Sequence, residues 1–189
     1  MRRLVALAAA AATLCAGCGL PHGHDPQPID RSRVPFGLLQ PLQRTPTAPQ
    51  RGPLSPLYFV HGKRLTAVPT HIQGLPVAAD ILRQLLVGPT PAQSRAGDAT
   101  FIPPRTALLS LRVAGGTASV NLSRAFAQST GSSDQVRAVA QIVYTLTARR
   151  PIERVSFAIE GRKIEVPDAR GRLSAKPRSR ADYRSLAPP

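Results

Sequence analysis

Three short turns that contain glycine divide residues 57–167, and their spacing constrains the fold more than any other feature. The turns are His61-Gly62, Ala114-Gly115-Gly116 and Glu160-Gly161. Each lies between runs of alternating apolar residues, the period of a strand with one buried face. Glycine supplies the positive φ that tight hairpins require, so we expect three β-hairpins between residues 57 and 167. The alternating positions are Leu109, Leu111 and Val113, then Ala118, Val120 and Leu122, and finally Val155, Phe157 and Ile159.

Two segments with helical spacing separate the hairpins, residues 75–88 and 132–147. Ser132 and Gln135 have the spacing of a capping box, which predicts the start of the second helix. Thr90-Pro91 predicts a short helical turn between the two segments. Because each helix shows one apolar stripe, we expect an α+β fold with both helices on one face of a small, mostly antiparallel sheet. The second stripe consists of Val136, Val139, Ala140, Val143, Leu146 and Thr147.

Residues 1–17 have the layout of a secretory signal. Arg2 and Arg3 precede an uncharged run of 14 residues, 4–17. A membrane-spanning helix needs roughly 18 apolar residues or more, so this run is too short to remain as an anchor. We therefore expect an exported protein.

Both cysteines of the chain, Cys15 and Cys18, lie at the end of this signal. A thioredoxin-type pair would sit near a βαβ pattern, and a zinc site would need further ligands at suitable spacing; the sequence shows neither. Ala16 and Gly17 before Cys18 instead resemble a bacterial lipobox, with Cys15 where leucine is customary. The resemblance implies that Cys18 carries a lipid and holds the protein on the outer face of the cytoplasmic membrane. Cleavage of an ordinary signal and a cytosolic thiol pair are the alternatives.

Residues 18–56 are rich in proline and predict a linker between the lipidated cysteine and the domain. Within it, residues 34–42 are unusually apolar for a tether. Two interpretations are open: this segment docks onto a partner protein, or it folds back onto its own domain. The docking side chains would be Val34, Phe36, Leu38 and Leu39.

Basic residues dominate the charge of the chain. The sequence has 25 Lys and Arg against 10 Asp and Glu, a net charge of +15, which becomes +13 without residues 1–17. The tail, residues 168–189, is basic and lacks apolar periodicity, so we expect it to be disordered. A basic tail next to a lipid anchor would add attraction to anionic lipids or wall polymers. A merely solubilising tail and binding of extracellular DNA are the alternatives.

Sequence motifs for catalysis are missing. No serine lies in a G-x-S-x-G or S-x-x-K pattern, and the acidic residues of the domain are spread over different elements. His22, His24 and Asp25 could attract a metal ion, but a proline-rich linker does not hold ligands in place, so a solvated tether is the simpler interpretation. We expect no catalytic residue, no metal, no cofactor and no small-molecule substrate.

Residues 57–167 resemble the GerMN domain, the sporulation and spore germination domain of bacterial lipoproteins. The resemblance rests on "LYFVHGKRL", on "LRQLLVGPT" followed by "FIPPRTALLSL", and on "FAIEGRKIEV". It implies a fold similar to the ring-building domains of secretion and sporulation machines, an envelope location and no established catalytic residues. Arginine accounts for 22 of the 25 basic residues, a bias that accompanies GC-rich genomes, and we expect an actinobacterial source.

The sequence thus predicts four parts: a signal (1–17), a linker (18–56), a GerMN-like domain (57–167) and a tail (168–189). The expected function is a non-enzymatic module that binds an envelope protein or self-associates while it is tethered to the membrane. A cell-wall polysaccharide binding protein or hydrolase is the alternative from another class, and it would require a cleft with two close carboxylates.

Overall fold

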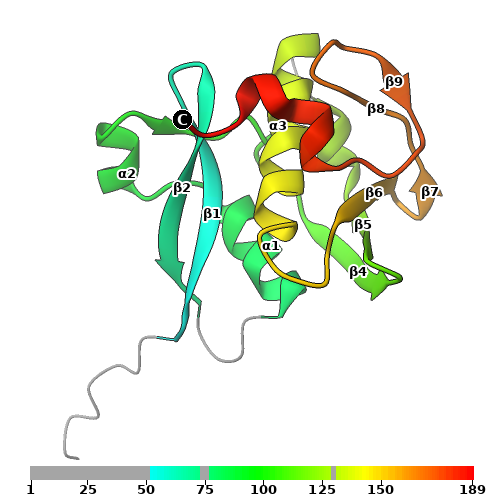
Figure 1. The fold of residues 1–189 in the computed structure, drawn as a ribbon, viewed down its shortest axis with the longest axis horizontal. Helices are drawn as coiled ribbons and strands as arrows, with labels where there is room; N and C mark the ends of the chain where they lie inside the picture. Colours follow the sequence, from blue (N-terminus) through cyan, green and yellow to red (C-terminus); the bar gives the residue numbers. More distant parts are fainter. Residues whose placement is uncertain (1–51, 73–76, 129–130) are drawn as a thin grey trace, which may run out of the picture. The chain divides into compact units, whose positions relative to one another are not determined.

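The computed structural model describes residues 52–72, 77–128 and 131–189 (Figure 1). The signal, Cys18 and the linker residues Val34, Phe36, Leu38 and Leu39 lie outside these ranges, so their roles stay predictions. Within the described ranges, no helix is long and apolar enough to cross a membrane.

The first sheet has the strand order β2-β1-β3. It consists of β1 (Leu54–His61), β2 (Arg64–His71) and β3 (Asp98–Ala99). β1 and β2 form the predicted hairpin and pair antiparallel along their full lengths. His61 is still paired with Arg64, so the turn residues are Gly62 and Lys63, one position later than predicted. Gly62 has a φ of 60°, a conformation that favours glycine.

The second sheet has the strand order β4-β5-β6-β7. Its strands are β4 (Leu108–Ala114), β5 (Thr117–Leu122), β6 (Arg154–Ile159) and β7 (Arg162–Lys163). The two predicted hairpins, β4-β5 and β6-β7, are antiparallel, whereas β5 and β6 are parallel. The chain crosses from β5 to β6 through η3 (Arg124–Gln128) and α3 (Ser132–Leu146), and such a crossover makes the joined strands parallel. The predicted α+β fold with mostly antiparallel strands is confirmed.

The two strands of the second hairpin are buried unequally. Ala118, Val120 and Leu122 of β5 are buried as predicted. Leu109 and Val113 of β4 are 51% and 42% exposed, because β4 is an edge strand and its register shifts next to Leu109. A strand with a neighbour on each side is covered more completely than an edge strand.

The helices begin and end close to the predicted positions. α1 (Ala78–Val87) buries Ile81, Leu82 and Leu85 and ends at Gly88. α2 (Pro91–Arg95) is capped by Thr90, as predicted, and the Thr90 hydroxyl accepts a hydrogen bond from the Gln93 amide. The predicted capping box of α3 is wrong. Ser132 is the first helical residue rather than the cap, and the preceding glycine occupies the cap position without a side-chain hydrogen bond.

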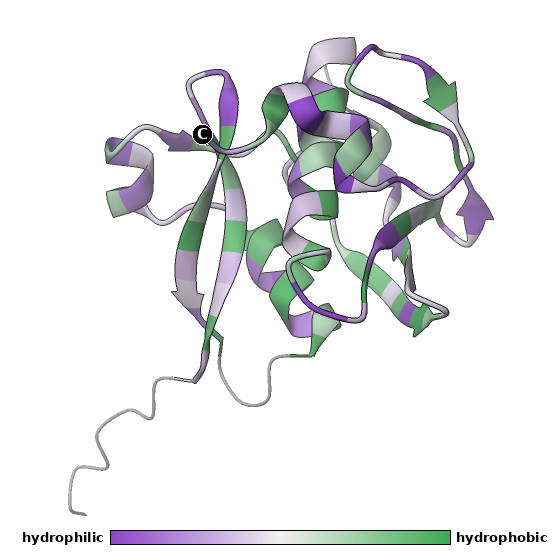
Figure 2. Ribbon diagram, viewed as in Figure 1, coloured by the Kyte–Doolittle hydropathy of each residue, from purple (hydrophilic) through white to green (hydrophobic). Residues whose placement is uncertain are grey.

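α3 lies at the centre of the domain (Figure 1) and contacts β1, α1, β6, β8 (Val166–Pro167) and η4 (Arg180–Leu186). The buried surface of α3 is therefore wider than the single apolar stripe that the sequence predicted. Residues on its other side are buried as well: Ala138, Gln141, Ile142, Tyr144 and Thr145. Figure 2 shows hydrophobic residues along β1, α1 and α3, whereas β7 is hydrophilic.

Two polar residues of α3 take the place of a missing strand beside β1. Tyr58 lies beyond the short pairing with β3, which involves only Val60 and His61. The Tyr58 amide donates to the Thr145 hydroxyl at 3.0 Å, and the Tyr58 carbonyl accepts from the Gln141 side chain at 3.1 Å. Buried backbone groups need partners, so these side chains satisfy the free edge of β1.

The C-terminal segment is folded, and the expectation of a disordered tail is wrong. Residues 168–189, the C-terminal extension, include β9 (Leu173–Ser174), which pairs with β8, and η4, which lies against α3. Tyr183 of this segment is fully buried. Composition suggested disorder because the segment has few apolar residues, but a small number of buried side chains is enough to fix it.

Candidate functional site

Asp168 organises the turn between β8 and β9. Its Oδ1 accepts hydrogen bonds from the amides of Arg170 and Arg172 at 2.8 and 3.0 Å, and its Oδ2 accepts from Arg172 Nε at 2.9 Å. Gly171 completes the turn with a φ of 79°. Burial alone would raise the pKa of Asp168, but these hydrogen bonds and the Arg172 charge outweigh it and hold the pKa below its ordinary value.

Buried contacts fix η4 to this turn. The buried Arg178 side chain donates to the carbonyls of Val166 and Arg172. Asp182 accepts hydrogen bonds from the amide and the hydroxyl of Ser179 and so caps η4.

Tyr183 is the apolar anchor of η4. Its hydroxyl donates to the Pro167 carbonyl at 2.6 Å, and its ring is fully buried. Burial raises the pKa of Tyr183 well above its ordinary value, because the phenolate would lose its hydration. The phenol therefore stays neutral and remains a hydrogen-bond donor at physiological pH.

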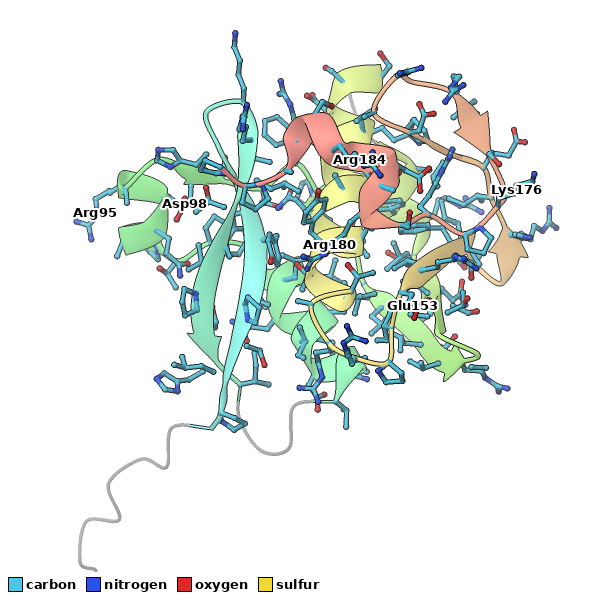
Figure 3. All side chains as sticks on the ribbon, viewed as in Figure 1. Arg95, Asp98, Glu153, Lys176, Arg180 and Arg184 are labelled. Carbon is cyan, nitrogen blue, oxygen red and sulfur yellow. The ribbon has the colours of Figure 1, made fainter. Side chains whose placement is uncertain are left out.

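Arg180 joins the C-terminal extension to β1 and α3 (Figure 3). Its guanidinium carbon lies 5.2 Å from the ring centroid of Tyr58 and 4.8 Å from that of Tyr144. Its Nε donates to the Thr147 hydroxyl at 2.9 Å and its Nη2 to the Tyr144 carbonyl at 2.8 Å. A cation at the C-terminus of a helix such as α3 is also favoured by the helix dipole. Arg180 therefore has a structural role.

A hollow of about 570 Å³ lies between the β8-β9 turn and η4, and we call it the C-terminal hollow. Arg170, Arg172 and Arg184 place three exposed cations around it. Arg184 is labelled on η4 in Figure 3. The C-terminal hollow is also lined by Asp168, Ala169, Ala181, Asp182 and Ser185. The arrangement can hold an anion, since the three arginines that line the hollow outnumber its two carboxylates.

A second basic surface lies on the face of β4-β5-β6 that carries Ser110, Ser119, Asn121 and Ser156. A shallow hollow of about 250 Å³ on this face is also lined by Arg112 of β4 and Lys163 of β7. The serine and asparagine side chains of this face are small and polar, so the face is an ordinary solvated sheet surface, with Arg112 and Lys163 on its edge strands.

The carboxylates of the C-terminal hollow lack one feature of a hydrolase site. A hydrolase with paired carboxyl groups needs one whose pKa is raised so that it can donate a proton. Asp168 and Asp182 are the two carboxylates that share the C-terminal hollow, and the pKa of Asp168 is lowered instead. In the same ranges, no group of three or more His, Cys, Asp and Glu residues is placed to hold a metal ion.

The histidines of the domain have ordinary structural surroundings. His61 Nδ1 lies 3.3 Å from Asp98 Oδ1, and His61 is more than half exposed. His71 belongs to β2 rather than to a connection, and its Nδ1 lies 2.7 Å from the Gly52 carbonyl oxygen. Neither histidine belongs to a group of three or more His, Cys, Asp and Glu residues that could hold a metal ion in the described part of the chain.

Sequence reasoning missed the residues that build the C-terminal hollow. One local signal was present: Ser179 and Asp182 have the spacing of a capping box, and the structure forms it. The contacts of Asp168, Arg178 and Arg180 involve elements far away in the sequence or in irregular turns, so residue spacing did not indicate them.

The fold and the site define a small α+β domain with an arginine-rich C-terminal extension. The chain belongs to the Germane family, described as "Sporulation and spore germination", and the family model matches residues 56–165. The whole C-terminal extension, including η4, therefore lies beyond the matched region.

Two solved structures have a similar fold. The first GerMN domain of the sporulation protein GerM from Bacillus subtilis is 22% identical, with a TM-score of 0.52, and the match covers 67% of this chain and 93% of that one. The tandem GerMN domains of the same protein are 20% identical, with a TM-score of 0.50. That match covers 67% of this chain but only 44% of the tandem protein. No curated protein matches the sequence.

Proposed function

We propose that this protein is a cell-envelope lipoprotein whose GerMN domain is a non-enzymatic interaction module. Cys18 would hold it on the outer face of the cytoplasmic membrane, and the domain would bind an envelope protein or a second copy of itself. Family membership supports an envelope role, and the similar fold of a sporulation protein is consistent with a role in sporulation or germination.

The observation that carries the non-enzymatic part is the state of the two carboxylates in the C-terminal hollow. Both accept hydrogen bonds from fixed donors, and Asp168 has a lowered pKa. A carboxylate whose pKa is lowered, as that of Asp168 is, does not act as a proton donor at neutral pH. The two carboxylates therefore stabilise the β8-β9 turn and the start of η4, while the arginine side chains around the hollow face solvent.

Tethering is tested by fractionation of cells that produce the wild-type chain or Cys18→Ser. We expect the wild-type protein in the membrane fraction, with a mass shift from the lipid, and accumulation of the unprocessed form when signal peptidase II is inhibited. A Cys18→Ser protein that is membrane-bound and processed as the wild type is would disprove the lipid anchor.

Partner binding is tested by crosslinking and pull-down of the lipidated protein from intact cells. A variant without residues 34–42 separates the two interpretations of the apolar linker segment. Loss of a partner from this variant, with retention by a chain that lacks nine other linker residues, would assign docking to Val34, Phe36, Leu38 and Leu39. Unchanged partners would exclude that role and place the binding surface elsewhere.

A further inference from the structure

Two of the three arginines of the C-terminal hollow form no ion pair within the described part of the chain, and the third is only partly engaged in one. Among the described residues, Arg170 and Arg184 have no carboxylate within 4.0 Å. Arg172 contacts Asp168 through Nε, but its side chain is 72% exposed. Three guanidinium groups from two segments thus surround one hollow while its carboxylates are occupied.

The backbone that presents these arginines is fixed before any ligand arrives. Asp168 binds the amides of Arg170 and Arg172, and the Ala169 amide donates to the Asp182 carbonyl at 3.0 Å. The buried Arg178 lies beneath and bonds to the Arg172 carbonyl. A site whose backbone is already ordered loses less entropy on binding than a disordered basic tail would.

The chemistry of the hollow points to a phosphate group. The planar guanidinium matches the oxygens of a phosphate with paired hydrogen bonds, which a lysine cannot reproduce. The apolar lining consists only of Ala169 and Ala181, so the hollow offers no pocket for a large apolar ligand. Leu173, which follows Arg172, is 58% exposed, and leucine together with basic residues is typical of surfaces that meet lipid headgroups.

We propose that the C-terminal hollow binds the phosphate of an anionic phospholipid headgroup through Arg170, Arg172 and Arg184. This inference rests on the proposed tether, which would keep the domain at high local concentration near the membrane. The hollow then acts as a second membrane contact that orients the domain.

The test uses the mature chain, residues 18–189, with Cys18→Ser, so that neither the signal nor a covalent lipid contributes to vesicle binding. Binding to vesicles of phosphatidylcholine with phosphatidylglycerol is compared with binding to phosphatidylcholine alone. The double variant Arg170→Gln with Arg184→Gln removes two cations from the hollow. The matched control, Arg95→Gln with Arg112→Gln, removes two exposed cations from α2 and β4. Circular dichroism and thermal unfolding confirm that all variants are folded.

We expect the hollow variant to bind the anionic vesicles about 25-fold more weakly, since each basic residue near an anionic surface contributes roughly fivefold. The control should change by much less. Equal losses in the two variants would overturn the proposal in favour of diffuse charge attraction. Equal binding to neutral vesicles, or thermal stabilisation by inorganic phosphate without vesicle binding, would also overturn it. The lipid mass shift of the wild-type chain and the processing of Cys18→Ser test the tether separately, so the two proposals can fail independently.

Discussion

The guanidinium of Arg180 stacks over the ring of Tyr144 at 4.8 Å, and this contact joins the C-terminal extension to the central helix. Tyr58 of β1 contacts the same guanidinium from another element, so one side chain connects three parts of the fold. The extension is thereby part of the core rather than an appendage.

Replacement of Arg180 by alanine should destabilise the domain by about 2–3 kcal/mol. The change removes two cation-π contacts and the hydrogen bonds to Thr147 and to the carbonyl of Tyr144. Chemical denaturation of both proteins measures the difference. Arg95→Ala serves as the control and should change stability by less than about 0.5 kcal/mol, because Arg95 lies exposed on α2. Equal effects would contradict the role assigned to Arg180.

Truncation after Pro167 should expose one side of α3. Tyr183, Arg178 and Arg180 would be lost, and Tyr144 and Thr147 would face water. We expect a lower midpoint of thermal unfolding and faster hydrogen exchange at the α3 amides. A truncated chain with unchanged exchange at α3 would show that the extension is dispensable for the fold.

Tyr183→Phe should reduce stability at neutral pH by about 1–3 kcal/mol, because the buried carbonyl of Pro167 loses its hydrogen-bond donor. The pKa of Tyr183 is raised in the folded state, so the wild-type protein loses stability as pH rises above about 10, where the unfolded chain begins to release the phenolic proton. In the variant, this alkaline loss should be shallower.

Unfolding free energies measured from pH 8 upward test both parts of this prediction. Tyr144 also has a raised pKa, mainly because of burial, so some alkaline loss should persist in Tyr183→Phe. A variant with the same alkaline slope as the wild type would contradict the buried, neutral state of Tyr183.

Thr145→Val should cost about 1–3 kcal/mol although it preserves the shape of the side chain. The amide of Tyr58 donates to the Thr145 hydroxyl, and in the variant this buried donor would have no partner. Denaturation together with hydrogen exchange of the Tyr58 amide measures the effect. Thr66→Val in β2 is the matched control and should be nearly neutral, since Thr66 is only half-buried and lies in an edge strand.

Local sequence patterns determined most of the secondary structure. Glycine turns near 62, 115 and 161 gave the three hairpins, and helical spacing gave α1 and α3, because these signals act between residues close in the chain. The motifs between 57 and 167 also indicated the family that the match confirms.

Only the tertiary structure decided how these elements pair and which of their faces are buried. The parallel pairing of β5 and β6 depends on the path of the crossover through α3, which no local pattern specifies. The burial of α3 on nearly all sides depends on the C-terminal extension, whose composition alone predicted disorder. Tyr183 and the contacts of Asp168 and Arg180 fix that segment through partners distant in sequence or in irregular turns. Such contacts form only once the chain has folded, and they also create the C-terminal hollow.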